Sequence, residues 1–134
     1  MSASLAVQTA IRTRLVATSA VTALVPADSI VDSHAERPDP CIVLGEDQEV
    51  DEGRIARDVV TVYSTLHLWK EEPSLEGVKA IAGAIRTAIN AGRLAVTGWH
   101  FGGAHVSSTR YLRDPDGVTS HGVLTIETIV SEVP

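Results

Sequence analysis

The segment YLRDPDGVTSHG, residues 111–122, is the most informative stretch of the chain. Its centre has the composition of a tight turn. Pro115 fixes φ near the value that the first central position of a type I turn requires, and Asp116 can accept hydrogen bonds from nearby backbone. Gly117 can adopt the left-handed conformation that lets a second strand start in register. The segment therefore predicts a hairpin turn formed by Asp114, Pro115, Asp116 and Gly117.

Long β-rich segments lie on both sides of this turn, Trp99 to Leu112 and Val118 to Val130. We expect them to pair as the two strands of a closing β-hairpin. The hairpin contains no nucleophile–base pair, metal-ligand spacing or phosphate-binding loop. The most distinctive part of the sequence thus favours a structural role over catalysis.

The length and composition indicate one globular domain, residues 1–134. A chain of 134 residues buries roughly two-thirds of the surface that it exposes when unfolded. Aromatic residues make up only 4% of the chain, so the core must be built mainly from Val, Ile, Leu and Ala. The formal net charge of −6 argues against attraction to nucleic acid or to an anionic membrane.

The sequence contains one cysteine, Cys41, so no disulfide can form within the chain. Polar residues from Gln8 to Arg14 interrupt the N-terminal segment, which therefore lacks the pattern of a signal peptide. No apolar run approaches the ~18 residues that a membrane-spanning helix needs. We expect a protein that stays in a cytoplasm or in a particle assembled there.

The first segment with helical periodicity begins at a cap formed by Ser2 or Ser4 and runs to about Thr18. Val7, Ile11 and Leu15 belong to its apolar stripe. Arg14 lies within the same stripe, so its guanidinium group must reach solvent or find a partner.

The remaining elements are predicted from alternation and from the turn signals between them. They are a short turn at Ser19–Leu24, strands at Ile30–Val31, Cys41–Leu44 and Arg57–Trp69, and a helix with Ser74 as its N-cap that stops at Gly92. The closing hairpin follows. This order is typical of an α+β domain with a mainly antiparallel sheet and two helices packed on one face.

Apolar side chains alternate with polar and aromatic ones along the strand that ends at Trp69. Val62, Leu66 and Leu68 share one face of this strand, so the intervening residues face the other side. Two helices do not cover both faces of such a sheet. We interpret the half-aromatic face as a candidate subunit interface, with solvated strand positions as the alternative. The residues assigned to it are Tyr63, His67, Trp69, Trp99 and Tyr111.

The segment Glu46–Ala56 is the most polar part of the chain and has almost no core-forming side chains. We interpret it as an exposed loop or hairpin arm that contacts a partner and becomes ordered on assembly. Its acidic spacing, continued to Asp58, faintly resembles a calcium loop, but Glu52 stands where such a loop needs glycine. A solvated segment is therefore the better interpretation. The proposed contact residues are Glu46, Asp47, Glu49, Asp51, Glu52 and Arg54.

The evidence for catalytic residues is weak throughout the sequence. Cys41 paired with His67 or His34 would give a thiol and a base, but Cys41 opens an apolar strand where a small buried side chain is usual. The five histidines show no metal-ligand spacing, and the glycines near His100 do not open a helix. We expect no catalytic residue, metal or cofactor.

Taken in their order along the chain, several sequence segments together resemble one known protein family. The segments that carry the resemblance are Leu24-Val25, Pro38-Asp39-Pro40, Cys41–Glu46, Val60–Trp69, Val78–Ile85, Leu112–Gly117 and His121-Gly122. They are similar to the tail-terminator proteins of long-tailed bacteriophages, also called tail-completion or head–tail joining proteins. Related proteins occur in prophages and in phage-derived gene transfer agents.

The resemblance implies a non-enzymatic α+β protein that forms a ring, most often a hexamer. Such a ring caps the tail tube, ends its growth and meets the head–tail connector or stopper protein, while DNA passes through without sequence-specific binding. A negatively charged lumen agrees with that role, because it repels phosphates. The alternative class is a small-molecule-binding or regulatory α+β module, which requires a pocket with converging polar groups.

Overall fold

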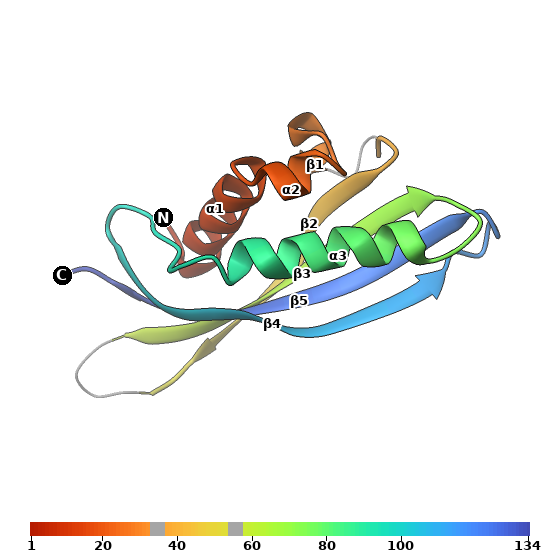
Figure 1. Ribbon diagram of the computed structural model, residues 1–134. Helices are drawn as coiled ribbons and strands as arrows, with labels where there is room; N and C mark the ends of the chain where they lie inside the picture. The colour runs from red at the N-terminus through yellow and green to blue at the C-terminus, as the bar shows by residue number, and fades with distance from the viewer. Residues whose placement is uncertain (33–36, 54–57) are drawn as a thin grey trace.

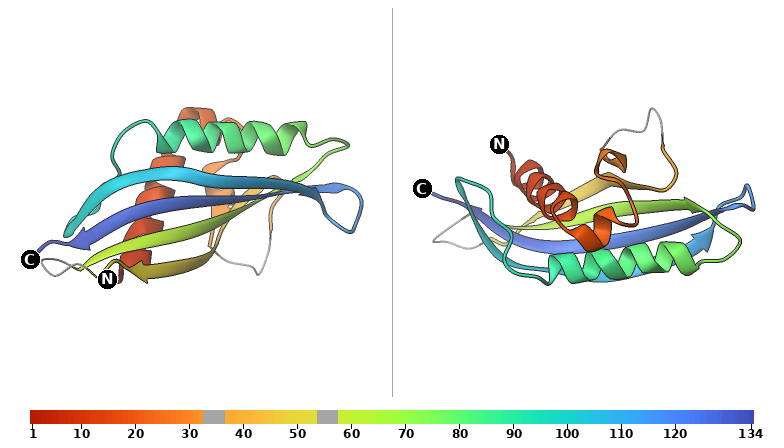
Figure 2. Two further views of the ribbon diagram at one scale, coloured as in Figure 1. Left: turned by 90° about the horizontal axis from the view of Figure 1, so that it is seen from below. Right: turned by 45° about the horizontal axis from the view of Figure 1, so that its top comes forward.

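The computed structural model describes residues 1–32, 37–53 and 58–134 of the chain. It has two layers, a five-stranded sheet and a layer of helices that covers one face of the sheet (Figure 1). Two further views show the same arrangement, with the other face of the sheet free of helices (Figure 2). The predicted α+β class is confirmed, with a third, very short helix in addition to the two expected.

The helical elements are α1 (Ala3–Val16), α2 (Ser19–Thr22), the one-turn 3₁₀ helix η1 (Ala27–Ser29) and α3 (Glu76–Ile89). Ser2 is the N-cap of α1, and its hydroxyl accepts a hydrogen bond from the Leu5 backbone N–H at 3.2 Å. In the described part of the chain, no helix is long and apolar enough to cross a membrane.

The strands are β1 (Ile30–Val31), β2 (Cys41–Asp51), β3 (Val59–Glu71), β4 (Trp99–Arg113) and β5 (Thr119–Glu132). Their order across the sheet is β1-β2-β3-β5-β4. All neighbours are antiparallel except β1 and β2, which are parallel. The closing hairpin therefore places β5 inside the sheet and β4 at its edge.

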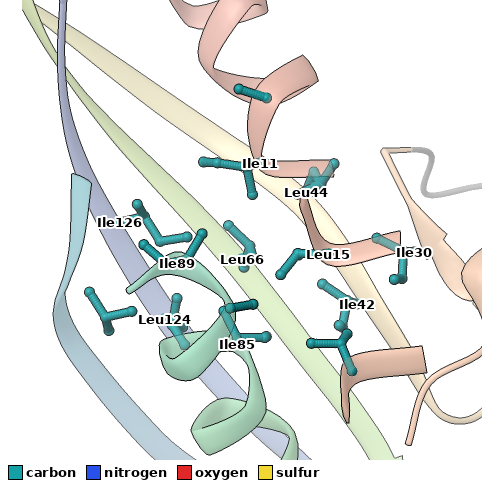
Figure 3. Close-up of a cluster of buried hydrophobic side chains, with 14 of the residues drawn as sticks. Ile11, Leu15, Ile30, Ile42, Leu44, Leu66, Ile85, Ile89, Leu124 and Ile126 are labelled. Carbon is teal, nitrogen blue, oxygen red and sulfur yellow. The ribbon is translucent and has the colours of Figure 1, made fainter. Parts of the chain in front are cut away.

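The core lies between the sheet and the helices. Val62, Leu66 and Leu68 of β3 point to the helical layer, as their alternation predicts, and directly face equivalent positions of β5. Leucine, isoleucine, valine and alanine fill most of this space, together with Phe101. Figure 3 shows the central cluster, which includes Ile11, Leu15, Ile30, Ile42, Leu44, Leu66, Ile85, Ile89, Leu124 and Ile126.

Arg14 is a charged residue within the apolar stripe of α1. Its side chain finds hydrogen-bond acceptors at the end of the neighbouring helix. Its guanidinium group donates hydrogen bonds to the carbonyls of Ala88, Gly92 and Arg93 at 2.8–3.1 Å. These carbonyls lie at the C-terminus of α3, where intrahelical donors are missing and where the helix dipole attracts a cation. Arg14 therefore joins α1 to α3.

The start of α3 differs from the prediction. The helix begins at Glu76, and the Ser74 hydroxyl accepts only the Glu76 N–H, at 3.2 Å. The carboxylate of Glu72 accepts the next two, from Gly77 at 2.7 Å and Val78 at 2.9 Å. Glu72 is thus the principal cap, because a carboxylate at a helix N-terminus both accepts hydrogen bonds and opposes the dipole.

The acidic segment belongs to a strand. β2 continues from Cys41 to Asp51 and pairs with β3 throughout, with a bulge between Leu44 and Asp47. Of the two alternatives, the hairpin arm is therefore the correct one, and its residues 46–51 are exposed as expected. Pairing with β3 overrides the low β propensity of acidic residues. Residues 54–56 of the segment lie outside the described residues.

The closing turn has the predicted geometry. The Gly117 N–H donates to the Asp114 carbonyl at 2.9 Å, and Gly117 has a φ of 78°. The Asp116 carboxylate accepts N–H donors from Val118 and Thr119, each at 2.9 Å. These bonds to its charged form lower the pKa of Asp116, the largest contribution coming from the Thr119 hydroxyl.

We predict that Gly117→Val lowers the melting temperature by roughly 3–8 °C, because a left-handed conformation costs a side chain on the order of 1–2 kcal/mol and β-branched residues avoid it. Gly117→Asn is the matched control and should have a smaller effect, since asparagine tolerates this conformation. Thermal unfolding of both variants gives the answer. Equal, negligible shifts would contradict the turn assignment.

Candidate interaction surface

The helix-free face of the sheet, called the open face below, is formed by alternate residues of the central strands. β3 contributes Tyr63, Thr65, His67 and Trp69, and β5 contributes their cross-strand neighbours, all half-buried. Ile129 of β5 is 42% exposed on the same face. A continuous surface of aromatic, apolar and polar side chains is thus left without a helical cover.

Two of the five predicted interface residues do not belong to the open face. Trp99 and Tyr111 pack against the hydrophobic core on the helical side. Tyr111 lies directly opposite Gly122, whose own cross-strand neighbour is the buried Leu68. Cross-strand neighbours point to the same face, so this register turns Tyr111 toward α3. Their placement on the helix-free face was wrong, and their role in a subunit interface stays a prediction.

Aromatic rings stack at one end of the open face. The Trp69 and His121 rings lie directly across the two central strands, with centroids 3.7 Å apart and planes 8° from parallel. The Arg37 guanidinium carbon lies 4.1 Å from the Trp69 ring centroid, which is a cation–π contact. Stacking of these planar groups therefore stabilises this end of the open face.

A hydrogen-bonded chain of titratable groups continues from the stack. His67 Nδ1 lies 2.8 Å from His121 Nε2, and His67 Nε2 lies 2.7 Å from a carboxylate oxygen of Glu46. The bulge of β2 places Glu46 on this side of the sheet. Gly45 makes the approach possible, because a Cβ there would lie 2.8 Å from His67 Cδ2.

The pKa of His121 lies below its ordinary value of 6.5. Burial is the main cause, and the neighbouring charge of His67 adds to it, followed by smaller contributions from Arg37 and Arg110. Asp114 acts in the opposite direction. The lowered pKa favours the neutral form of His121.

The carboxylates of the acidic arm have partners within the chain. Glu49 accepts the Ser4 N–H of α1 at 2.8 Å, and Glu52 accepts the Thr61 hydroxyl. Partial burial is the main factor that raises the pKa of Asp47. These contacts and the pairing with β3 place residues 46–51 in a strand of the single chain, and ordering of the arm on assembly stays a prediction. Arg54 lies outside the described residues.

Among the described residues considered for catalysis, Cys41 and His67 do not form a hydrogen-bonded pair of nucleophile and base. Cys41 is buried, and burial raises the pKa of its thiol to about 11, which disfavours the nucleophilic thiolate. His67 is bonded to His121 and Glu46 instead, and His34 lies outside the described residues. Within residues 1–32, 37–53 and 58–134, no three His, Cys, Asp or Glu side chains are placed to hold a metal ion.

An open hollow of about 220 Å³ lies beside the closing turn, lined mainly by acidic side chains and by Arg37 and Trp69. Its acidic members are Asp39, Glu71, Asp114 and Asp116. It lacks the apolar enclosure that is typical of small-molecule sites. The open face, the acidic arm and the turn are together better suited to contacts with other proteins.

The fold and these surfaces define a small α+β protein with one covered and one open sheet face. The family model "Tail completion protein gp17" matches residues 9–131, so the chain belongs to this family. None of the curated proteins matches the chain at a significant level.

Solved structures share the fold. A chain of the structure described as "Virion of native gene transfer agent (GTA) particle" superposes with a TM-score of 0.83 at 17% identity, covering 92% of this chain and 93% of that one. The gp17 protein of bacteriophage SPP1 superposes with a TM-score of 0.63 at 19% identity, covering 98% and 91%. The predicted resemblance to tail-completion proteins is thus confirmed.

We predict that the chain loses stability as the pH falls below 6.5, because the unfolded chain then binds a proton that folded His121 resists. The stabilisation is present above the unfolded pKa and disappears as the pH falls through the folded pKa. His121→Gln should flatten the dependence of melting temperature on pH between about 7.5 and 5. His100→Gln, at an exposed position of β4, is the matched control and should leave the slope unchanged. Equal slopes in all three proteins would contradict the assignment.

Proposed function

We propose that this chain forms a closed ring, a hexamer, that caps the last ring of a tail tube, ends its growth and joins it to the head–tail connector or stopper protein. The observation that carries the proposal is the family match over residues 9–131. The particle is a phage or a phage-derived gene transfer agent, assembled in a bacterial cytoplasm. The role is structural and uses no cofactor.

The asymmetry of the sheet supports a ring. Helices cover one face, so a subunit placed with its helices outward turns Tyr63, His67 and Trp69 toward the interior. Cyclic symmetry satisfies all lateral contacts of a small protein and leaves only the two ends of the ring for other partners. That is the geometry needed to stop the growth of a tube.

The two ends of the sheet supply different axial contacts. The turn Asp114–Gly117 lies at one end, where β3 reaches Glu71, and Asp51 of the acidic arm lies opposite Val60 at the other (Figure 1). One end would contact the tail tube and the other the connector. The proposed arm contacts are Glu46, Asp47, Glu49, Asp51, Glu52 and Arg54.

The charge of the chain supports a conduit. A formal net charge of −6 per copy gives a hexamer a strongly negative field. Such a field repels phosphate groups, so DNA slides through the ring without being held.

Particles made without this chain should contain DNA-filled heads and free tails of uneven length, since nothing ends tube growth or joins the two parts. Electron microscopy of lysates measures tail length and joining, and the wild-type chain supplied in trans should restore both. Joined particles with tails of normal length in the absence of the chain would contradict the proposed function.

A further inference from the structure

Two edges of the sheet are open. β4 pairs only with β5, so its outer edge carries unpaired backbone groups. On the opposite side, β1 pairs with β2 only at Ile42 and Val43. No described strand borders residues 46–51 of β2 on the side away from β3. Unpaired strand edges favour pairing with a further strand.

The two edges have opposite charge. β2 carries Glu46, Asp47, Glu49 and Asp51 in its outer half and no basic residue there. β4 contains Arg110, Arg113 and two histidines, and no acidic residue along its 15 positions. An acidic edge strand and a basic edge strand on the same chain are expected where copies of that chain make head-to-tail contacts.

The bulge-free part of β4 and the exposed half of β2 also agree in length. Bulges interrupt β4 between Phe101 and Ala104 and between Val106 and Ser108. Beyond them, Ser108–Arg113 pairs with β5 without a break and includes both arginines. This segment has six residues, as does Glu46–Asp51.

We propose that Asp47–Asp51 of one copy pairs with Thr109–Arg113 of the next, with Asp47 opposite Arg113, so that side chains of the two strands share matching faces and the sheet continues around the ring. The inference rests on the proposed ring. The pairing is antiparallel, because β2 and β4 run in opposite directions within a copy and rotation about the ring axis preserves strand direction. Each copy then uses one edge of each kind.

This pairing requires successive copies to be displaced along the strand direction, as neighbouring strands are in a closed β-barrel. Thr109–Arg113 lies level with Leu66–Lys70 of β3, whereas the arm lies level with Val60–Ser64. Successive copies are therefore offset by about 20 Å along the strands. Over four strands about 4.8 Å apart, this offset tilts the strands by about 45°, within the range found in closed barrels.

Hydrogen–deuterium exchange of the purified full-length chain, dilute and then concentrated until rings form, tests the pairing. Alternate amides in both segments, 47–51 and 109–113, should exchange more slowly in the ring, while β3 and β5 remain protected in both states. Negative-stain microscopy of the same samples identifies the rings.

A charge variant adds a second readout. Arg110→Gln should raise the concentration needed for ring formation by roughly two- to fivefold, the range for a single exposed ion pair. Arg86→Gln removes the same charge from the exposed side of α3 and should not change it.

The possible results distinguish a failure of the edge pairing from a failure of the proposed function. Rings without slower exchange at either edge, or a chain that never forms rings alone but still ends tails in the particle, would overturn the edge pairing only. A chain that forms no ring and is also dispensable for tail completion would overturn both.

Discussion

The helical layer covers only one face of the sheet, and this constraint governs the rest of the structure. The buried side chains of β3 and β5 can contact α1 and α3 only on that side, so the alternate residues of the same strands must face away from the core. Arg14 of α1 adds hydrogen bonds to carbonyls at and just after the C-terminal end of α3. One packed layer stabilises the subunit, and the second face of the sheet has no helical cover.

The acidic residues stabilise the subunit as well as giving it charge. Glu72 caps α3, Glu49 accepts the backbone N–H of Ser4, and Glu46 binds His67. A carboxylate near the N-terminus of a helix stabilises the helix through its dipole. These carboxylates are therefore held at defined positions in the subunit, and residues 46–51 form a strand paired with β3.

Local sequence signals predicted the features that depend on neighbouring residues. The turn followed from Pro115 and Gly117, the core face of β3 followed from its alternation, and Arg14 was recognised as a side chain in need of a partner. The features that depend on strand register were not predictable in this way. The helical side of Tyr111 is set by its pairing with Gly122. The His67–His121 pair joins residues that are 54 positions apart. The length of β2 comes from pairing with β3, which a run of acidic residues conceals.

The central claim is that the subunit presents its helices outward and its open face to the interior of a ring. A reconstruction of the head–tail junction of the particle at side-chain resolution tests it most directly. We expect α1 and α3 on the outer surface of the ring, with Tyr63 and His67 facing the channel. A junction ring in which the helices of this chain line the channel, or a junction that does not contain the chain, would contradict the account.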